Sequence, residues 1–383
     1  MNTTTEDAAT STSITTTVSR TVTTTTTTIS TSGGESSTPF DVLYDAIARK
    51  LPHAEVSGRV VMAGEFPVIG HEMVIEGKGN ATLDAAEWEF RPFVVRGRGA
   101  KLTLKNLQLY KGQAPLKSSR AAKRFPPLAD GGSVLVYDGA SLEMHNVFVN
   151  HSKSWRGAAI AAYGASKVTV VGCRFLNNYA WYAGGGIYLA EGSNASVFNC
   201  SFERNKGSEE GGAIAVTGGS YLRSERTTYR RNTGKREGGA GIMVEHPGSV
   251  VISIDDLFFE NKGVLPSAVG GAILVRDNGT LFVSGSRFVR NRARGGKGNT
   301  IFVEEGGIIG RLTNGPTEKD VEWPSNQPKP DMPMGMTTET ENNAMATEAM
   351  AMEMETMEKK AMAMESTTTI GSQSLPPPRL LTG

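Results

Sequence analysis

The residues best suited to acid–base chemistry recur at one position of a repeating pattern in the second half of the chain. They follow Ile242, Ile273 and Ile301 by three and four residues, and they are Glu245 and His246, Arg276 and Asp277, and Glu304 and Glu305. A carboxylate can remove a proton or protonate a leaving group, and a nearby cation can hold a sugar acid. The six residues therefore indicate a lyase or hydrolase site for acidic polysaccharide. A charge-rich, solvated turn explains them equally well.

A second set of residues could bind carbohydrate without catalysis. Aromatic and basic side chains gather in two loops, at Lys153, Trp155 and Arg156 and, about one repeat later, at Tyr179, Trp181 and Tyr182. Exposed rings can stack on sugar rings, and Lys or Arg can pair with acidic groups. If the loops are neighbours in space, they form a glycan-binding platform. The alternative is that the rings fold back over the flank of the fold as packing.

The elements that position these residues are predicted by a repeat. Ile or Val recurs at Val134, Ile160, Ile187, Ile214, Ile242, Ile273 and Ile301, with steps of 26, 27, 27, 28, 31 and 28 along the chain. An aromatic residue recurs at Phe148, Phe175, Phe202, Tyr229, Phe258 and Phe288, with steps of 27, 27, 27, 29 and 30. A fixed period of this length is typical of a solenoid. The repeated residues are β-formers and turn-formers rather than a leucine-rich framework, so the predicted coil consists of three short strands and three turns.

In such a coil, residues one period apart lie above one another, about 4.8 Å apart. The aromatic and Ile positions then form two buried columns. A third column is expected three residues after the aromatic positions, where Asn tolerates a left-handed bend and its amide can hydrogen-bond along the column. Its members are Asn178, Asn205, Asn232, Asn261 and Asn291, and His151 interrupts it. Gly211 and Gly212 should form a corner where a positive φ or a close backbone approach excludes a Cβ.

Cys173 and Cys200 lie one repeat apart and each precedes its Phe by two residues, so they should be vertical neighbours that point inward. Free thiols in a core column and a disulfide between coils both fit this spacing. Two cysteines are too few for a Cys-based zinc site, and no metal or cofactor is expected.

The repeated motifs resemble those of a known superfamily. FLNN, FERN, FFEN and FVRN, together with GGGI and two copies of GGAI, are similar to the F-x-x-N and G-G-A-[ILV] repeats of chlamydial polymorphic outer membrane proteins. The chain thus resembles a right-handed parallel β-helix of the pectin-lyase-like superfamily. The resemblance implies an all-β solenoid of about 8–9 coils over residues 56–310, and it does not imply an activity.

The rest of the chain differs in composition from the repeats. The predicted domains are a Thr-rich disordered segment (1–38), an amphipathic capping helix (39–55), the β-helix (56–310), a cap or linker (311–340), and a Met/Ala/Glu-rich low-complexity tail (341–383). Lys plus Arg number 40 and Asp plus Glu number 39, so composition gives no reason to expect nucleic acid as a partner. No apolar run is long enough for a transmembrane helix, and no signal peptide is visible.

These patterns favour a non-catalytic, adhesin-like β-helix protein that presents a face for glycans or proteins. The expected partners are a polysaccharide or a cell-surface protein. The fold and a Thr-rich stalk favour an extracellular or cell-surface location, whereas the sequence leaves the compartment and the oligomeric state open. The alternative function is that of a polysaccharide lyase or glycoside hydrolase.

Overall fold

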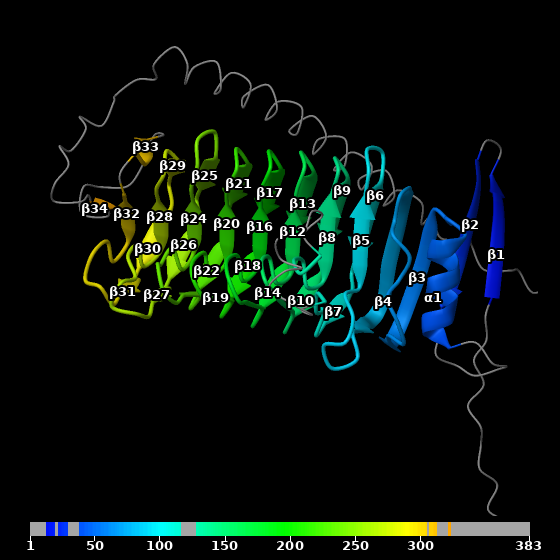
Figure 1. Cartoon of the computed structure of the whole chain (residues 1–383). Coiled ribbons are helices and arrows are strands. Elements are labelled where there is room, and N and C mark those ends of the chain that lie inside the picture. The colour runs from blue at the N-terminus through cyan, green and yellow to red at the C-terminus, as the bar shows by residue number, and fades with distance from the viewer. Residues whose placement is uncertain are drawn as a thin grey trace, which may run out of the picture. The chain divides into compact units, whose positions relative to one another are not determined.

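The computed structural model describes residues 13–19, 22–29, 38–115, 128–304, 306–311 and 321–322, with side chains described in 38–115, 128–304 and 306–310. Apart from one short helix and one antiparallel strand pair near the N-terminus, the described residues form a parallel β-solenoid in which each coil lies beside the next (Figure 1). Every strand pair within the solenoid is parallel, and partners lie about one repeat apart, as Ile187 and Ile214 do. The predicted fold class is confirmed.

Three sheets form the wall of the solenoid. The first sheet has nine strands, one from each coil: β5 (Phe93–Arg96), β8 (Val134–Tyr137), β12 (Ile160–Ala162), β16 (Ile187–Leu189), β20 (Ile214–Val216), β24 (Ile242–Val244), β28 (Ile273–Val275), β32 (Ile301–Val303) and β34 (Val321–Glu322). The third sheet has six short strands: β11 (Lys153–Ser154), β15 (Tyr179–Ala180), β19 (Lys206–Gly207), β23 (Thr233–Gly234), β27 (Lys262–Gly263) and β31 (Arg292–Ala293).

The second sheet bends along its length, so that each coil contributes one strand before the bend and one after it. The strands before the bend are β3 (His53–Val61), β4 (Glu72–Asp84), β6 (Lys101–Lys105), β9 (Ser141–His145), β13 (Lys167–Val171), β17 (Asn194–Phe198), β21 (Tyr221–Glu225), β25 (Val250–Ile254), β29 (Thr280–Ser284) and β33 (Ile308–Arg311). Those after it are β7 (Gln108–Tyr110), β10 (Phe148–Asn150), β14 (Arg174–Leu176), β18 (Ser201–Glu203), β22 (Thr228–Arg230), β26 (Leu257–Phe259) and β30 (Arg287–Val289). β3 and β4 cover both positions in one strand each.

The core contains a continuous stack of aromatic rings. Phe175 and Phe202 lie with their ring centroids 4.5 Å apart and their planes 7° apart. Tyr229 follows at 5.3 Å from Phe202, and its buried hydroxyl forms a 2.8 Å hydrogen bond with Ser224 Oγ. The stack ends with Phe258 and Phe288, whose centroids are 4.9 Å apart. The repeat spacing predicted this column because side chains one period apart share one position in the wall.

Phe148 does not belong to this stack, although the sequence spacing placed it there. Its register partner in β14 is Arg174, and the residue above Phe175 is the buried Val149. Side chains of a strand alternate between its two faces, so a shift of one residue turns Phe148 outward. There the guanidinium carbon of Arg174 lies 5.3 Å from the centroid of the Phe148 ring.

The asparagine column forms a ladder of buried hydrogen bonds. The side-chain oxygen of Asn205 accepts two hydrogen bonds from Asn178, one from the backbone N–H (3.1 Å) and one from the side-chain amide (2.9 Å). The same pattern repeats from coil to coil down to Asn291. Ser152, rather than His151, occupies the column position above Asn178, since its N–H donates to Asn178 Oδ1 at 2.9 Å.

The left-handed bend lies one residue before each column asparagine, and not at the asparagine itself as expected from the sequence. The preceding residues have φ values of 53° or 54°, and they are Asn177, Arg204, Arg231, Glu260 and Arg290. The column asparagines instead stabilise the turn through their side chains. At the next corner, Gly211 has a φ of 58°, and a Cβ on Gly212 would lie 2.4 Å from the carbonyl oxygen of Ala240. Gly211 therefore has the expected positive φ, and Gly212 has the expected close backbone approach.

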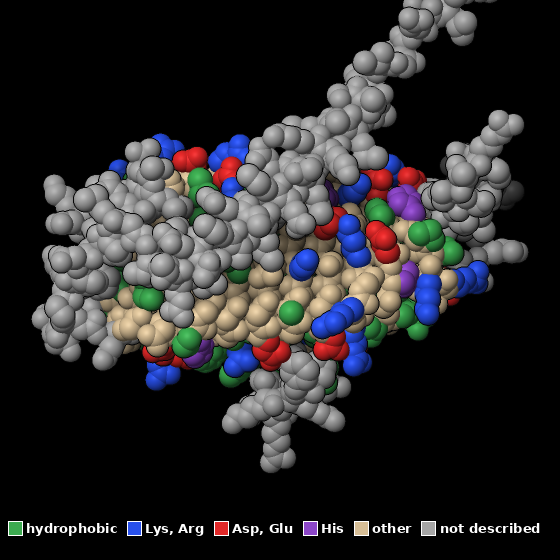
Figure 2. Space-filling model, turned by 90° about the horizontal axis from the view of Figure 1, so that it is seen from above, with side chains coloured by type: hydrophobic (Ala, Val, Ile, Leu, Met, Phe, Trp, Pro, Cys, Tyr) green, Lys and Arg blue, Asp and Glu red, His purple; other side chains and the backbone are tan. Residues whose placement is uncertain are grey.

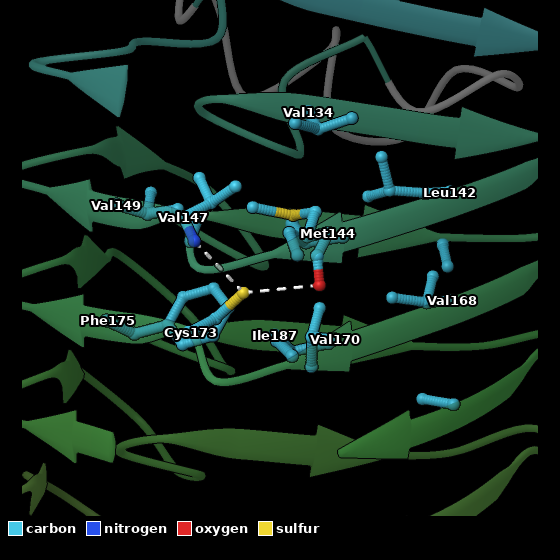
Figure 3. Close-up of a cluster of buried hydrophobic side chains, with 14 of the residues drawn as sticks. Val134, Leu142, Met144, Val147, Val149, Val168, Val170, Cys173, Phe175 and Ile187 are labelled. Atoms are coloured by element: carbon cyan, nitrogen blue, oxygen red, sulfur yellow. Dashed lines mark hydrogen bonds between the residues drawn. The ribbon is translucent and has the colours of Figure 1, made fainter. Parts of the chain in front are cut away.

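Both cysteines are free and buried, which agrees with the first of the two arrangements considered from the sequence. Figure 3 shows Cys173 in the core, with its sulfur 3.5 Å from the backbone N–H of Val147. The N–H of Cys173 in turn donates to Cys200 Sγ at 3.3 Å. Thr227, Asp256 and Ser286 continue this column with the same backbone-to-side-chain bonds. The cysteines therefore act as hydrogen-bond acceptors in a polar column.

Helix α1 (Pro39–Ala48) lies at the N-terminal end of the solenoid (Figure 1). It begins with a capping box between Thr38 and Asp41, which satisfies backbone N–H groups of the first turn. Phe40 is buried on the helix and stacks on Phe66 with ring centroids 5.1 Å apart, and Phe66 stacks on Phe93 at 5.7 Å. The helix therefore covers the apolar end of the core, as its amphipathic pattern predicts.

The structure describes two antiparallel strands within the Thr-rich segment, β1 (Ser13–Ser19) and β2 (Val22–Ile29), and β2 pairs with β3. The sequence predicted no ordered element in this segment. Threonine has a high preference for strands, which explains the difference. The cap or linker at 311–340 and the tail at 341–383 lie outside the described residues except at 311 and 321–322.

Candidate functional site

Two groups of polar side chains lie on the outside of neighbouring coils. One group follows the first-sheet strands β24, β28 and β32, and the other lies on and after the third-sheet strands β11 and β15. Figure 2 shows that on the side of the solenoid uppermost in Figure 1, many of the charged side chains lie along its long borders. Most residues of these two groups lie at turns, because every second side chain of a strand points into the core.

Arg276 is the centre of the first group. Its guanidinium bonds Glu245 Oε2 through Nε (2.9 Å) and Nη2 (2.7 Å), and the same Nη2 lies 2.6 Å from Glu210 Oε2. Glu237 accepts a bond from Nη1, and Asp277 Oδ2 lies 3.7 Å from Nε. We call Arg276 and these four acidic residues the Arg276 cluster. The structure thus brings Glu245, Arg276 and Asp277 together, as their spacing predicts.

The other predicted catalytic residues have different positions. His246 Nδ1 lies 3.7 Å from Glu245 Oε1 and 2.5 Å from Thr217 Oγ1, so it borders the Arg276 cluster. Burial raises the pKa of Glu304, the charge of Arg276 opposes this, and the negative charges of Asp277 and Glu237 act in the same direction as burial. Glu305 lies outside the described residues.

Two members of the cluster, Glu210 and Glu237, were not predicted. Adjacent residues of a strand point to opposite faces, which argues against a joint role for Glu209 and Glu210 if they lie in a strand. Glu210, however, follows the short strand β19 at a corner, where that alternation does not apply. The available signal was the sequence spacing: Glu210 and Glu237 lie 27 residues apart and each directly precedes a glycine pair, although the structure pairs Glu210 with Gly238.

Two carboxyl groups of the Arg276 cluster, Glu210 and Glu237, have pKa values shifted in opposite directions. The side chain of Glu210 is only 1% exposed. Burial raises its pKa to about 9, and the nearby charges of Glu245 and Glu237 act in the same direction. Glu237 is 43% exposed; burial acts to raise its pKa, but its hydrogen bond to Arg276 and the charge of that residue together lower it. At neutral pH we therefore assign the proton to Glu210 and a negative charge to Glu237.

This assignment predicts how stability depends on pH. The pKa of Glu210 is higher in the folded protein than its usual value, so the folded state loses stability as pH rises from about 4.5 to about 9. In Glu210→Gln the amide cannot ionise, and this contribution to the loss should disappear. Urea unfolding at several pH values in that window should show that the free energy of unfolding of the variant increases relative to that of the wild type as pH rises.

Glu209→Gln is the matched control for this prediction, because the Glu209 carboxylate pairs with the exposed Arg236. It should keep the pH dependence of the wild type. Identical pH profiles for Glu210→Gln and the wild type would show that Glu210 does not retain its proton in the folded state.

The second group contains the six residues of the predicted glycan-binding platform. Trp155 and Tyr182 come from successive coils, with ring centroids 6.2 Å apart and planes 12° apart. Tyr179 and Trp181 form an edge-to-face pair at 5.0 Å. All four rings are partly exposed, so they combine packing with accessible surface.

The cations of this group lie against aromatic rings. The guanidinium carbon of Arg156 is 5.2 Å from the ring centroid of Tyr182 and 5.4 Å from that of Tyr188. Lys153 Nζ lies 3.4 Å from the ring centroid of Trp88, at the edge of the group. The structure therefore brings Trp155, Arg156 and Tyr182 together, and it directs Lys153 toward Trp88.

A buried carboxylate, also absent from the predicted set, supports this group from below. Asp130 is fully buried, and its Oδ1 accepts a 2.9 Å bond from the backbone N–H of Arg156. Its Oδ2 accepts a bond from the Tyr163 hydroxyl. Burial raises the pKa of Asp130 to about 6 even though these bonds and the charge of Arg156 act to lower it. Asp130 fixes the backbone that carries Trp155 and Arg156.

Comparison with known proteins gives the class of this chain. Residues 95–305 match the sequence model of a family described as the right-handed β-helix region. The match covers more than half of the chain, and the chain therefore belongs to this family. No curated protein matches the sequence closely. In the described part of the chain, no helix has the length and apolar character that a membrane span requires.

Proposed function

We propose that the chain is a non-catalytic, surface-exposed or extracellular β-helix protein that binds glycans through Trp155, Tyr182 and Arg156. The observation that carries the proposal is the pair of nearly parallel, partly exposed rings with a guanidinium beside them. Parallel rings offer flat apolar faces to sugar rings, and Arg156 offers donors to acidic substituents. The likeness of the F-x-x-N and G-G-A-[ILV] repeats to those of polymorphic outer membrane proteins supports a surface role.

Rigid placement is the physical advantage of this surface. Trp155 and Arg156 directly follow β11, and Tyr182 follows β15, so their backbones are tied to the solenoid wall. Tyr182 N–H donates to the carbonyl oxygen of Trp155 at 2.8 Å, which holds the two coils in register at this point. A preformed surface loses little conformational entropy on binding.

The test is glycan binding by the full chain and by the double variant Trp155→Ala, Tyr182→Ala. An array of acidic and neutral glycans identifies a ligand, and titration with that ligand gives the affinity. The double variant should weaken binding by about tenfold or more, equivalent to about 1.4 kcal/mol. Tyr221→Ala is the matched control, because Tyr221 is a partly exposed aromatic residue on β21, in a different sheet. Unchanged affinity in the double variant, or an equal loss in the control, would refute the platform.

A second candidate function is the cleavage of acidic polysaccharide at the Arg276 cluster. In its favour, Glu210 and Glu237 share the guanidinium of Arg276, and Glu210 keeps a proton while Glu237 is ionised. Glycosidases use such a pair as acid and base. Glu210 is buried and Arg276 already occupies both carboxylates, which favours a stabilising role for the cluster. Incubation with a panel of acidic polysaccharides, followed by assays for new reducing or unsaturated ends, tests the alternative.

A further inference from the structure

Two acidic side chains of the Arg276 cluster and a histidine that borders it converge in a way that suits a metal ion. One ligand atom each from Glu245, His246 and Asp277 lies within 4.8 Å of the others. Glu245 and His246 follow β24, and Asp277 follows β28, so the stacking of coils brings them together. The sequence alone predicted no metal site, because a His and two acids on separate repeats become a set only in the folded solenoid.

The charge balance of this region favours an additional cation. Glu210, Glu237, Glu245 and Asp277 surround one cation, Arg276. Glu210 Oε1 is buried and forms no hydrogen bond within the described part of the chain. A buried carboxyl oxygen without a partner is costly, and here it belongs to a carboxyl that shares the Nη2 of Arg276 with Glu245. Even with the proton assigned to Glu210, the single positive charge of Arg276 is shared among Glu237, Glu245 and Asp277.

The three side chains are held in a manner suited to coordination. Arg276 bonds Oε2 of Glu245, which leaves Oε1 facing His246 at 3.7 Å from Nδ1. Thr217, on the preceding coil, forms a 2.5 Å hydrogen bond with His246 Nδ1 and holds the ring beside the carboxylates. Such a bond orients a coordinating histidine when the metal binds the other ring nitrogen, so Nε2 is the expected ligand atom of His246. His246 and Asp277 are 52% and 61% exposed, so small side-chain rotations can bring them to coordination distance.

We propose that Glu245, His246 and Asp277 bind one divalent transition-metal ion, such as Zn²⁺, on the outside of the solenoid. One imidazole and two carboxylates are a donor set for Zn²⁺, Co²⁺ or Mn²⁺, and the absence of sulfur from the set disfavours Cu(I). Three protein ligands leave at least one coordination position for water or an external anionic ligand.

Calorimetric titration of the full chain with Zn²⁺ tests the proposal, and titration with Co²⁺ adds visible d–d bands that report nitrogen and oxygen ligands. We expect one Zn²⁺ ion per chain at this site. His246→Gln and Asp277→Asn should each weaken its binding by about tenfold or more, and Thr217→Val should weaken it by about tenfold through loss of ring orientation. Because His246 and Asp277 are exposed, circular dichroism should show that both variants keep the fold.

The control is a second His–Glu–Glu group near the N-terminal end, formed by His53, Glu55 and Glu76. His53→Gln should leave the affinity for Zn²⁺ unchanged. The proposal would be overturned if the wild type bound Zn²⁺ with a Kd above about 1 mM, which corresponds to a binding free energy weaker than about 4.1 kcal/mol. It would also be overturned if His246→Gln bound like the wild type, or if binding were lost in His53→Gln and kept in His246→Gln.

Discussion

Replacing Arg276 with methionine is expected to lower the free energy of unfolding by about 3–5 kcal/mol at neutral pH. The guanidinium is only 16% exposed and bonds Glu245 and the buried Glu210 directly, with Glu237 on its third nitrogen. Methionine can fill much of the volume but provides no charge, so partly buried carboxylates would be left facing one another. Unfolding by urea at neutral pH measures the loss.

The control for this prediction is Arg290→Met. Arg290 is 76% exposed and its contact to Glu260 is 3.8 Å long, so its loss should cost less than about 1 kcal/mol. The difference between the two variants should shrink at acid pH, where Glu237, whose pKa Arg276 lowers, takes up a proton. Equal losses for Arg276→Met and Arg290→Met at neutral pH would mean that the cluster contributes little to folding.

The solenoid could be predicted from the sequence because its core residues repeat in one dimension. A stacked coil requires the same side-chain type at the same place in each turn, and Phe175, Phe202 and Phe258 meet that requirement at nearly constant spacing. Residues in a globular core satisfy no such rule, since their neighbours come from unrelated positions. The asparagine ladder was predictable for the same reason.

The errors occurred where one residue decides the outcome. Phe148 follows Val134 by one position fewer than Phe175 follows Ile160, and this difference places Val149 and not Phe148 in the core. A count of aromatic residues misses that shift, whereas the alternation of a strand makes its consequence complete. The left-handed bend was misplaced by one residue too, because the asparagine side chains stabilise a turn formed by their neighbours.

The candidate site was predictable only in part, because it combines residues of different turns. Glu245 and Arg276 share one repeat position and Asp277 occupies the next, so the repeat spacing identified all three. Glu210 and Glu237 contact the same guanidinium from another corner of the coil. Their contacts with Arg276 depend on where each coil turns after its third-sheet strand. That geometry follows from backbone conformation at the corners, which the repeat spacing does not specify.

Replacing Phe202 with alanine tests the register on which all of these contacts depend. Phe202 is fully buried between Phe175 and Tyr229, so the variant should lose about 3–5 kcal/mol of unfolding free energy, measured by urea unfolding. Phe288 is partly buried and has one stacked neighbour, Phe258, so Phe288→Ala should lose less. Phe148→Ala is the decisive control. The Phe148 ring points outward in the structure, whereas the spacing of aromatic residues in the sequence places it in the core column. A loss of unfolding free energy as large as that of Phe202→Ala would contradict the observed pairing of Val149 with Phe175.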